Sequence, residues 1–197
     1  MKPSLPRGFK TRAEKLSIHY RKDLGLGPSQ ACPSHRLAQL LGFKLASNGY
    51  LIRLLNAGFC DDYISSPNPT EQLSGLYQAK FSAMLAIVNE EKMILFDEQE
   101  SLERQESSIM HELAHALCEH PGDALQLRSD MALRIHNSSY EYEAEWMGGA
   151  LQIPDVGMFW HAKRGRTVED IARIYNASIE MAQFRWNVCG ITRRLGR

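Results

Sequence analysis

Residues 101–120 read SLERQESSIMHELAHALCEH, and this stretch constrains the fold more than any other part of the sequence. Ser101 is placed to cap the start of a helix, and Pro121-Gly122 follows its expected end. The apolar positions follow the spacing of one helix face, at Ile109, Met110, Leu113, Ala114 and Leu117. The pattern predicts a helix that is partly buried against the rest of the chain.

The same helix carries an HExxH pattern at His111, Glu112 and His115. Residues four apart on a helix differ by about 40° in direction and by one turn in height, so both imidazoles face one point. Two imidazole nitrogens supply half of a tetrahedral zinc site, and Glu112 points off that face, where a general base reaches a metal-bound water. The alternative is a pair of surface histidines beside an ordinary acid.

A third ligand is expected from the segment YEYEAEWMGGALQIP at residues 140–154, which holds Glu141, Glu143 and Glu145. Carboxylates this close repel one another on a helix unless a cation neutralises some of them. A solvated acidic face is the alternative, but large apolar neighbours indicate a half-buried segment, and a buried carboxylate needs a partner. One of these carboxylates would complete a His₂Glu zinc site with a fourth position left for water.

Elsewhere the sequence predicts two N-terminal helices, a β-hairpin and a C-terminal helix-turn-helix-like piece. The first helix is expected over Lys10–Leu24, the second over 34–41 with Gly42 as its stop, and the hairpin strands over 81–88 and 93–96, joined by the turn 89–92. Near the C-terminus, Thr167 and Asp170 resemble a capping box, and the turn 176–178 joins two helices.

Composition excludes several other classes of protein. Lysine plus arginine and aspartate plus glutamate both number 23, so no global charge indicates nucleic acid or a membrane surface, and no apolar run approaches the ~18 residues of a membrane span. The four scattered cysteines contain no CxxC pair, which indicates reduced thiols and a cytoplasmic protein. The cysteines are Cys32, Cys60, Cys118 and Cys189.

Four blocks of sequence, in this order, resemble the ImmA/IrrE family of zinc metallopeptidases. The blocks are LPRGFKTRAEKLSIHYRKDLGL, FSAMLAIVNEEKMILFDEQESLERQESSIMHELAHALCEH, EYEAEWMGGALQIP and TVEDIARIYNASIEMAQFRWNVCG. The resemblance implies an α+β, mostly helical fold: a helical N-terminal region and a zincin-like, gluzincin-like core with a small β-sheet or hairpin on the HExxH helix, over residues 1–160. A helix-turn-helix-like segment, packed on this core, would follow over residues 161–197.

The resemblance also implies the site residues: one zinc ion per chain, held by His111, His115 and the glutamate before the helix alanine, with Glu112 as the base. That glutamate is Glu143, and Glu141, two residues earlier, is the alternative. Manganese, cobalt or iron would also suit a His₂Glu site. Two departures from the family pattern E-A-x-x-(F/L)-A-x-x-L-L-x-P are the glycine pair at 148–149 and a glutamine at 152; the glycines weaken the helix but permit close packing on the HExxH helix.

Other polar residues near the motif are weaker candidates for a role in the site. Tyr140 and His136 are candidate donors to a substrate oxyanion, although such residues are more often ordinary loop or packing residues. His120 lies about 140° around a continuous helix from His115 and is not counted as a ligand.

By resemblance, the expected function is zinc-dependent cleavage of a peptide bond in a helix-turn-helix transcriptional repressor, which relieves repression. The alternative is a DNA- or protein-binding regulator with a structural or vestigial metal. Direct DNA binding by the C-terminal helices is disfavoured but not excluded, because the second helix is short and rich in apolar groups. The arginines that would contact DNA are Arg185, Arg193, Arg194 and Arg197.

Overall fold

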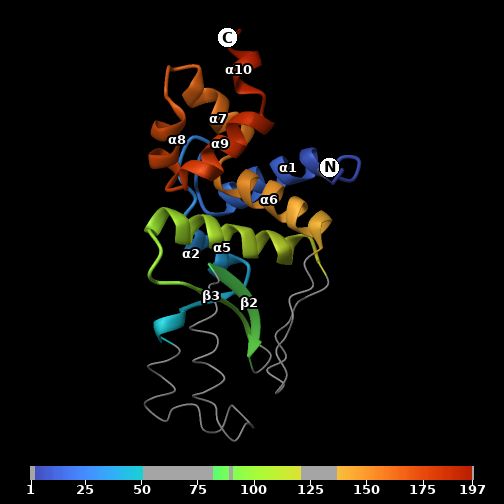
Figure 1. Ribbon diagram of the computed structural model, residues 1–197, viewed down its shortest axis with the longest axis vertical. Helices are drawn as coiled ribbons and strands as arrows, with labels where there is room; N and C mark the ends of the chain where they lie inside the picture. The colour runs from blue at the N-terminus through green and yellow to red at the C-terminus, as the bar shows by residue number, and fades with distance from the viewer. Residues whose placement is uncertain (1–2, 51–81, 89–90, 121–136, 197) are drawn as a thin grey trace, which may run out of the picture.

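The structure is a computed structural model that describes residues 3–50, 82–88, 91–120 and 137–196. Within these ranges helices predominate over one three-stranded sheet, which confirms the expected α+β, mostly helical fold class. Helix α5 (Leu102–Leu117) is central: the sheet packs on one side of it, and α6 (Ser138–Gln152) packs on the other (Figure 1). Helix α1 (Phe9–Asp23) lies along α6, so α6 is enclosed between two other helices.

The sheet has the strand order β1-β3-β2 among the described residues. Strands β2 (Ala83–Val88) and β3 (Glu91–Phe96) pair antiparallel, which confirms the hairpin. The turn was predicted too long, because residues 91 and 92 already pair with the opposite strand; residues 89–90 lie outside the described residues. Strand β1 (Lys44–Ser47), which follows α2 (Ser34–Leu40), pairs parallel to β3 and was not foreseen, since four residues carry too little periodicity.

The C-terminal helices lie at the end of the molecule opposite the sheet (Figure 1). Helices α8 (Val168–Tyr175) and α9 (Ile179–Val188) confirm the predicted helix pair, and Thr167 and Asp170 form the reciprocal capping box. Asn176 adopts a left-handed φ of 50°, which ends α8 and starts the turn. Helices α7 (Asp155–Ala162) and α10 (Ile191–Arg194) were not foreseen because both are short.

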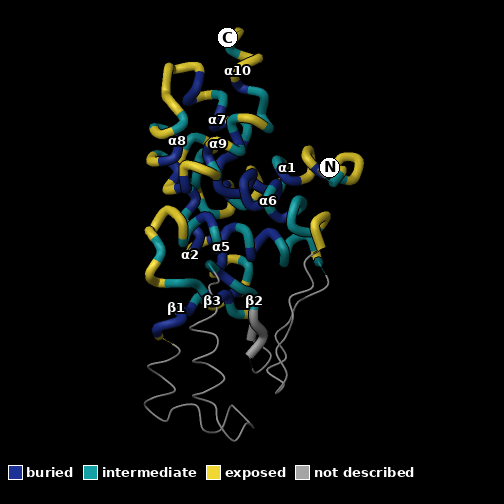
Figure 2. The backbone as a smooth tube through the Cα atoms, in the orientation of Figure 1, coloured by how far each residue is buried: buried dark blue, intermediate teal, exposed yellow. Residues whose placement is uncertain are grey.

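Apolar side chains gather into two main clusters, and buried residues are concentrated along α6 (Figure 2). The larger cluster joins α1, α2, the sheet, α5 and α6, whereas the smaller one joins α7 to α10 around Ile153. The proposed boundary at residue 160 stays a prediction, and α7 belongs to the smaller cluster. Within the described ranges, no helix has both the length and the apolar character needed to cross a bilayer.

Candidate metal centre

Helix α5 presents the two histidines of the HExxH motif on the side that its apolar face leaves uncovered. Ser101 caps the helix by accepting from the backbone N–H of Arg104, and the apolar residues of the motif region are fully buried between the sheet and α6. These residues include Met110, Leu113 and Ala114. Burial of that face fixes the rotation of the helix, so the imidazoles of His111 and His115 face the N-terminal part of α6.

Three ligand atoms converge at this point. The two Nε2 atoms of His111 and His115 lie 3.0 Å apart, and the carboxylate of Glu141 lies 3.2 Å from the first and 3.7 Å from the second. Ligand atoms bound about 2.0–2.1 Å from one tetrahedral zinc ion stand about 3.3–3.4 Å from one another. The three side chains therefore fit a single zinc ion in both donor chemistry and spacing.

The structure brings Glu141, the alternative third ligand, to the histidine pair. Glu143, the first choice, instead lies with its carboxylate 3.2 Å from Nε2 of His120. Residues two apart on a helix point about 200° apart, so the two glutamates cannot direct their side chains to one point in the same way. Both glutamates lie on the expected helix, and Glu141 is the one whose carboxylate lies beside the histidine pair.

His120 is the residue that sequence reasoning missed. The expected helix ran to residue 120, but α5 ends at Leu117, and Glu119 takes a left-handed φ of 54°. The chain turns back, so that the backbone N–H of His120 donates to the carbonyl of His115 and the two Nδ1 atoms lie 2.9 Å apart. The Pro121-Gly122 pair was the available signal, since a helix that must stop before proline frays over its last residues.

A second group of candidate ligands lies directly behind the first. Cys118, His120 and Glu143 hold a thiol, an imidazole and a carboxylate within 4.8 Å of one another. Burial, reinforced by the charge of Glu143, raises the pKa of the Cys118 thiol to about 11. Without a metal, the thiol therefore keeps its proton at neutral pH.

Glu112 lies on a different face of α5, buried against the sheet with an exposed fraction of 4%. The backbone N–H of Leu85 in β2 donates to its Oε2 at 3.1 Å. A strand of the hairpin therefore holds this carboxylate in a fixed position beside the helix turn that carries the histidines.

Of the two candidate oxyanion donors, only Tyr140 can be placed. Its ring stacks on the ring of His120, with centroids 4.6 Å apart and an interplanar angle of 23°. His136 lies outside the described residues. The stacking contact restricts the orientation of the His120 imidazole.

Close packing sets the distance between the two helices that carry the site. A Cβ atom built on Gly148 would lie 3.0 Å from the carbonyl oxygen of Met110 and 3.2 Å from the backbone of His111. Gly149 faces the other way, toward Arg185 and Met181 of α9. The expectation that the glycine pair permits close approach to the HExxH helix is therefore confirmed for Gly148 alone.

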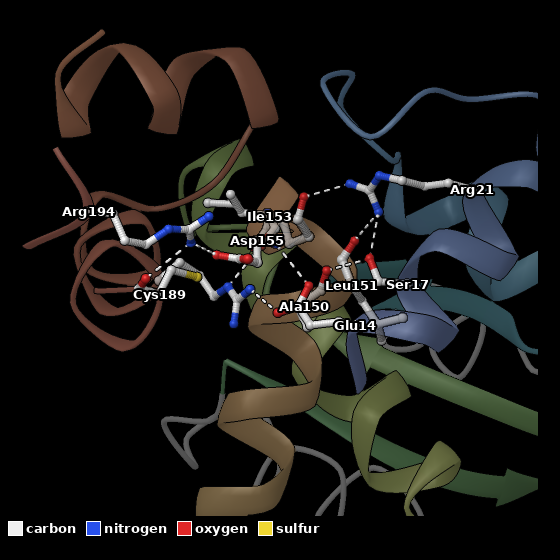
Figure 3. Close-up of polar contacts among 11 residues, drawn as sticks. Glu14, Ser17, Arg21, Ala150, Leu151, Ile153, Asp155, Cys189 and Arg194 are labelled. Carbon is white, nitrogen blue, oxygen red and sulfur yellow. Dashed lines mark hydrogen bonds and ion pairs between the residues drawn. The ribbon is translucent and has the colours of Figure 1, made fainter. Parts of the chain in front are cut away.

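Buried polar side chains fix the C-terminal end of α6. Arg21, only 1% exposed, donates to the carbonyls of Leu151 and Gln152, and Ser17 donates to the carbonyl of Ala150 (Figure 3). The carbonyl of Gly149 accepts from the backbone of Ile153, so all four terminal carbonyls have a partner. The axial position of α6, and with it that of Glu141, is thereby set from the far end of the helix.

Two packed helices bring two histidines and a carboxylate together, and a buried glutamate directly follows the first histidine. This is the arrangement of a metallopeptidase. The family model of Peptidase M78, the IrrE N-terminal-like domain, matches residues 74–187, which is more than half of the chain. The chain belongs to this family, so the resemblance to the ImmA/IrrE metallopeptidases is confirmed and its function is of the metallopeptidase type; the first of the four blocks lies outside the matched residues. Comparisons with curated proteins and with solved structures gave no significant match.

Proposed function

We propose that the chain is a zinc-dependent endopeptidase whose metal is held by His111, His115 and Glu141. The observation that carries the proposal is the convergence of these three side chains, with ligand atoms 3.0–3.7 Å apart, in a chain of a peptidase family. Bound zinc supplies Lewis acidity that activates both the attacking water and the peptide carbonyl. Three protein ligands leave the fourth position of a tetrahedral zinc ion for water or substrate.

Glu112 handles the protons of the reaction. Its carboxylate accepts the proton of the attacking water and later delivers it to the leaving amine of the cleaved peptide. The hydrogen bond from the backbone of Leu85 holds the carboxylate in place, so less conformational freedom is lost when substrate binds.

The substrate that we propose is a helix-turn-helix transcriptional repressor, whose cleavage relieves repression. This part of the proposal is supported by the family resemblance. It is tested by incubating the zinc-loaded chain with purified helix-turn-helix repressors and by analysing the products by mass spectrometry.

Glu112→Gln tests the mechanism most sharply. The amide keeps the size and the hydrogen bond to Leu85 but accepts no proton, so cleavage should fall by at least about 10²-fold with zinc content unchanged. Glu103→Gln, at an exposed position of the same helix, is the matched control and should cleave as wild type does. Undiminished cleavage by Glu112→Gln would remove Glu112 from the mechanism.

The DNA-binding alternative finds little support in the C-terminal helices. Arg185 is fully buried and pairs with Glu14, while Arg194 pairs with Asp155, so two of the candidate arginines have partners within the chain. Helix α9 packs on both apolar clusters, through Phe184 and Trp186 respectively. These contacts favour a packing role for the helix pair.

A further inference from the structure

Behind the proposed metal centre, a chain of polar contacts leads away from the metal ligand His115. Its Nδ1 atom lies 2.9 Å from Nδ1 of His120, and Nε2 of His120 lies 3.2 Å from Oε2 of Glu143. The side chain of His120 is only 6% exposed, and the ring of Tyr140 stacks on it. The chain of contacts is thus shielded from water, where hydrogen bonds orient side chains most effectively.

Proton positions along this chain follow from metal binding. A metal on Nε2 of His115 takes the lone pair of that atom, so the proton of the neutral ring is on Nδ1. That N–H must donate to Nδ1 of His120, which therefore carries its own proton on Nε2 and donates it to Glu143. Every donor then faces an acceptor, and each ring has a single allowed tautomer.

The same reasoning bears on the second ligand group. If Cys118, His120 and Glu143 also held a metal through Nε2 of His120, both neutral rings would carry a proton on Nδ1, and two N–H groups would face each other at 2.9 Å. Occupancy of the first site therefore disfavours a metal at the second.

We propose that His120 and Glu143 form a positioning pair that orients His115 toward the metal and fixes its tautomer. The pair binds no metal of its own while the His111–His115–Glu141 site is filled. This inference rests on the proposed function, because it requires a metal on His115. Hydrogen-bond partners of this kind contribute about 10–100-fold to metal affinity.

Metal affinity provides a test that does not depend on catalysis. Cobalt(II) is titrated into the full-length chain by absorption, and zinc affinity is then obtained by competition. We expect His120→Ala and Glu143→Ala each to weaken binding about 10–100-fold, and the double variant to weaken it no further, because both break one chain of contacts. His120→Asn keeps an acceptor near the former Nδ1 but loses the bond to Glu143, so it should bind the metal as Glu143→Ala does and no more weakly than His120→Ala.

A second readout is the tautomer of each histidine, measured by ¹⁵N NMR on the zinc-loaded wild-type chain. We expect protonated Nδ1 on His115 and protonated Nε2 on His120. This measurement needs no variant, so it tests the proposal even where a substitution prevents folding. A protonated Nδ1 on His120, or a metal-bound Nε2 there, would overturn the proposal.

The outcomes separate the inference from the function on which it rests. If His111→Ala binds metal as wild type does, the proposed metal site is wrong. If His111→Ala loses the metal while His120→Ala binds normally, the site stands and the positioning pair is wrong. If Glu143→Ala abolishes binding and Glu141→Ala does not, Glu143 is itself the ligand and the pair is overturned.

Discussion

The two ends of helix α6 are held by opposite kinds of chemistry. At the C-terminal end, arginines that are 0–1% exposed donate to backbone carbonyls, while Nε of Arg21 and Nη1 of Arg185 are buried without a hydrogen-bond partner. At the N-terminal end, glutamates whose side chains are up to 28% exposed meet a cluster of imidazoles that are up to 25% exposed, and the ligand atoms are arranged around a point that suits a cation. One end is therefore a structural anchor, and the other, the binding end, carries the proposed metal ligands.

This division explains how a half-buried polar site keeps its geometry. Carboxylates and imidazoles packed at one helix end contribute little to the stability of the metal-free chain, because their charges repel or require a cation. The C-terminal end of α6 keeps the helix in place, because the buried guanidinium groups of Arg21 and Arg185 bind its carbonyl end. The two ends should therefore respond differently to substitution.

The largest effect is expected from removing a ligand at the binding end. Glu141→Ala should weaken zinc binding on the order of 10³-fold, about 4 kcal/mol, because the ion loses its one charged ligand. The stability of the metal-free chain should change by less than about 0.5 kcal/mol. Glu145→Ala, on the same helix, is the matched control, and both quantities are measured by cobalt titration and urea unfolding.

Removing an anchor should give the opposite result. Arg185→Leu loses bonds to Ile153 and Glu14 and leaves that carboxylate partly buried without its partner, so the free energy of unfolding should fall by about 3 kcal/mol. Arg173→Leu removes an exposed pair with Asp170 and should cost less than about 0.5 kcal/mol. Urea unfolding of both variants makes the comparison, and equal losses would show that Arg185 is no anchor.

The two adjacent glycines of α6 face different neighbours: Gly148 lies against α5, which carries the histidines, and Gly149 lies against α9, which carries the anchor residue Arg185. Gly148→Ala places a methyl group against the backbone of α5, which cannot yield as a flexible side chain can, so we expect a net loss of about 1–2 kcal/mol and weaker metal binding. Gly149→Ala meets side-chain atoms of α9 instead and should lower stability without changing metal affinity per folded molecule. A metal affinity equally weakened in both variants would contradict the division.

Alkaline pH should lower the free energy of unfolding through Cys189, a thiol on the anchor side. Burial, with Asp155 and Glu14 adding to it, raises the pKa of Cys189 to about 12, whereas an unfolded thiol titrates near ~8.5. Above that pH the unfolded chain releases a proton that the folded chain retains, so stability falls as pH rises, by up to about 1 kcal/mol per pH unit. Cys189→Ala should reduce this slope between pH 8.5 and 10, and an unchanged slope would contradict the assignment.

The elements that could be predicted from the sequence are those whose apolar residues recur at regular spacing. The motif helix, the helix with the glutamates, the hairpin and the α8–α9 pair all repeat their apolar spacing long enough to be recognised, and the capping box of Thr167 is local in sequence. Burial of the apolar face of α5 then decides where its histidines point.

The remaining parts depend on contacts between distant residues. The identity of the carboxylate beside the histidines follows from the rotation of α6, which the bonds of Arg21 and the close approach of Gly148 determine. The position of His120 follows from where α5 ends, which differs by three residues from the expectation. The helix rotation could not be derived from local pattern alone, and for the helix end the pattern gave only the stop signal of Pro121-Gly122.

The central claim is that His111, His115 and Glu141 hold one metal ion. Anomalous X-ray diffraction at the zinc edge, on crystals of the zinc-loaded chain, tests it most directly. The account predicts a single peak about 2.0–2.1 Å from both Nε2 atoms and about 2.0–2.2 Å from the Glu141 carboxylate. A peak coordinated by Glu143 in place of Glu141, or one among Cys118, His120 and Glu143, would contradict it.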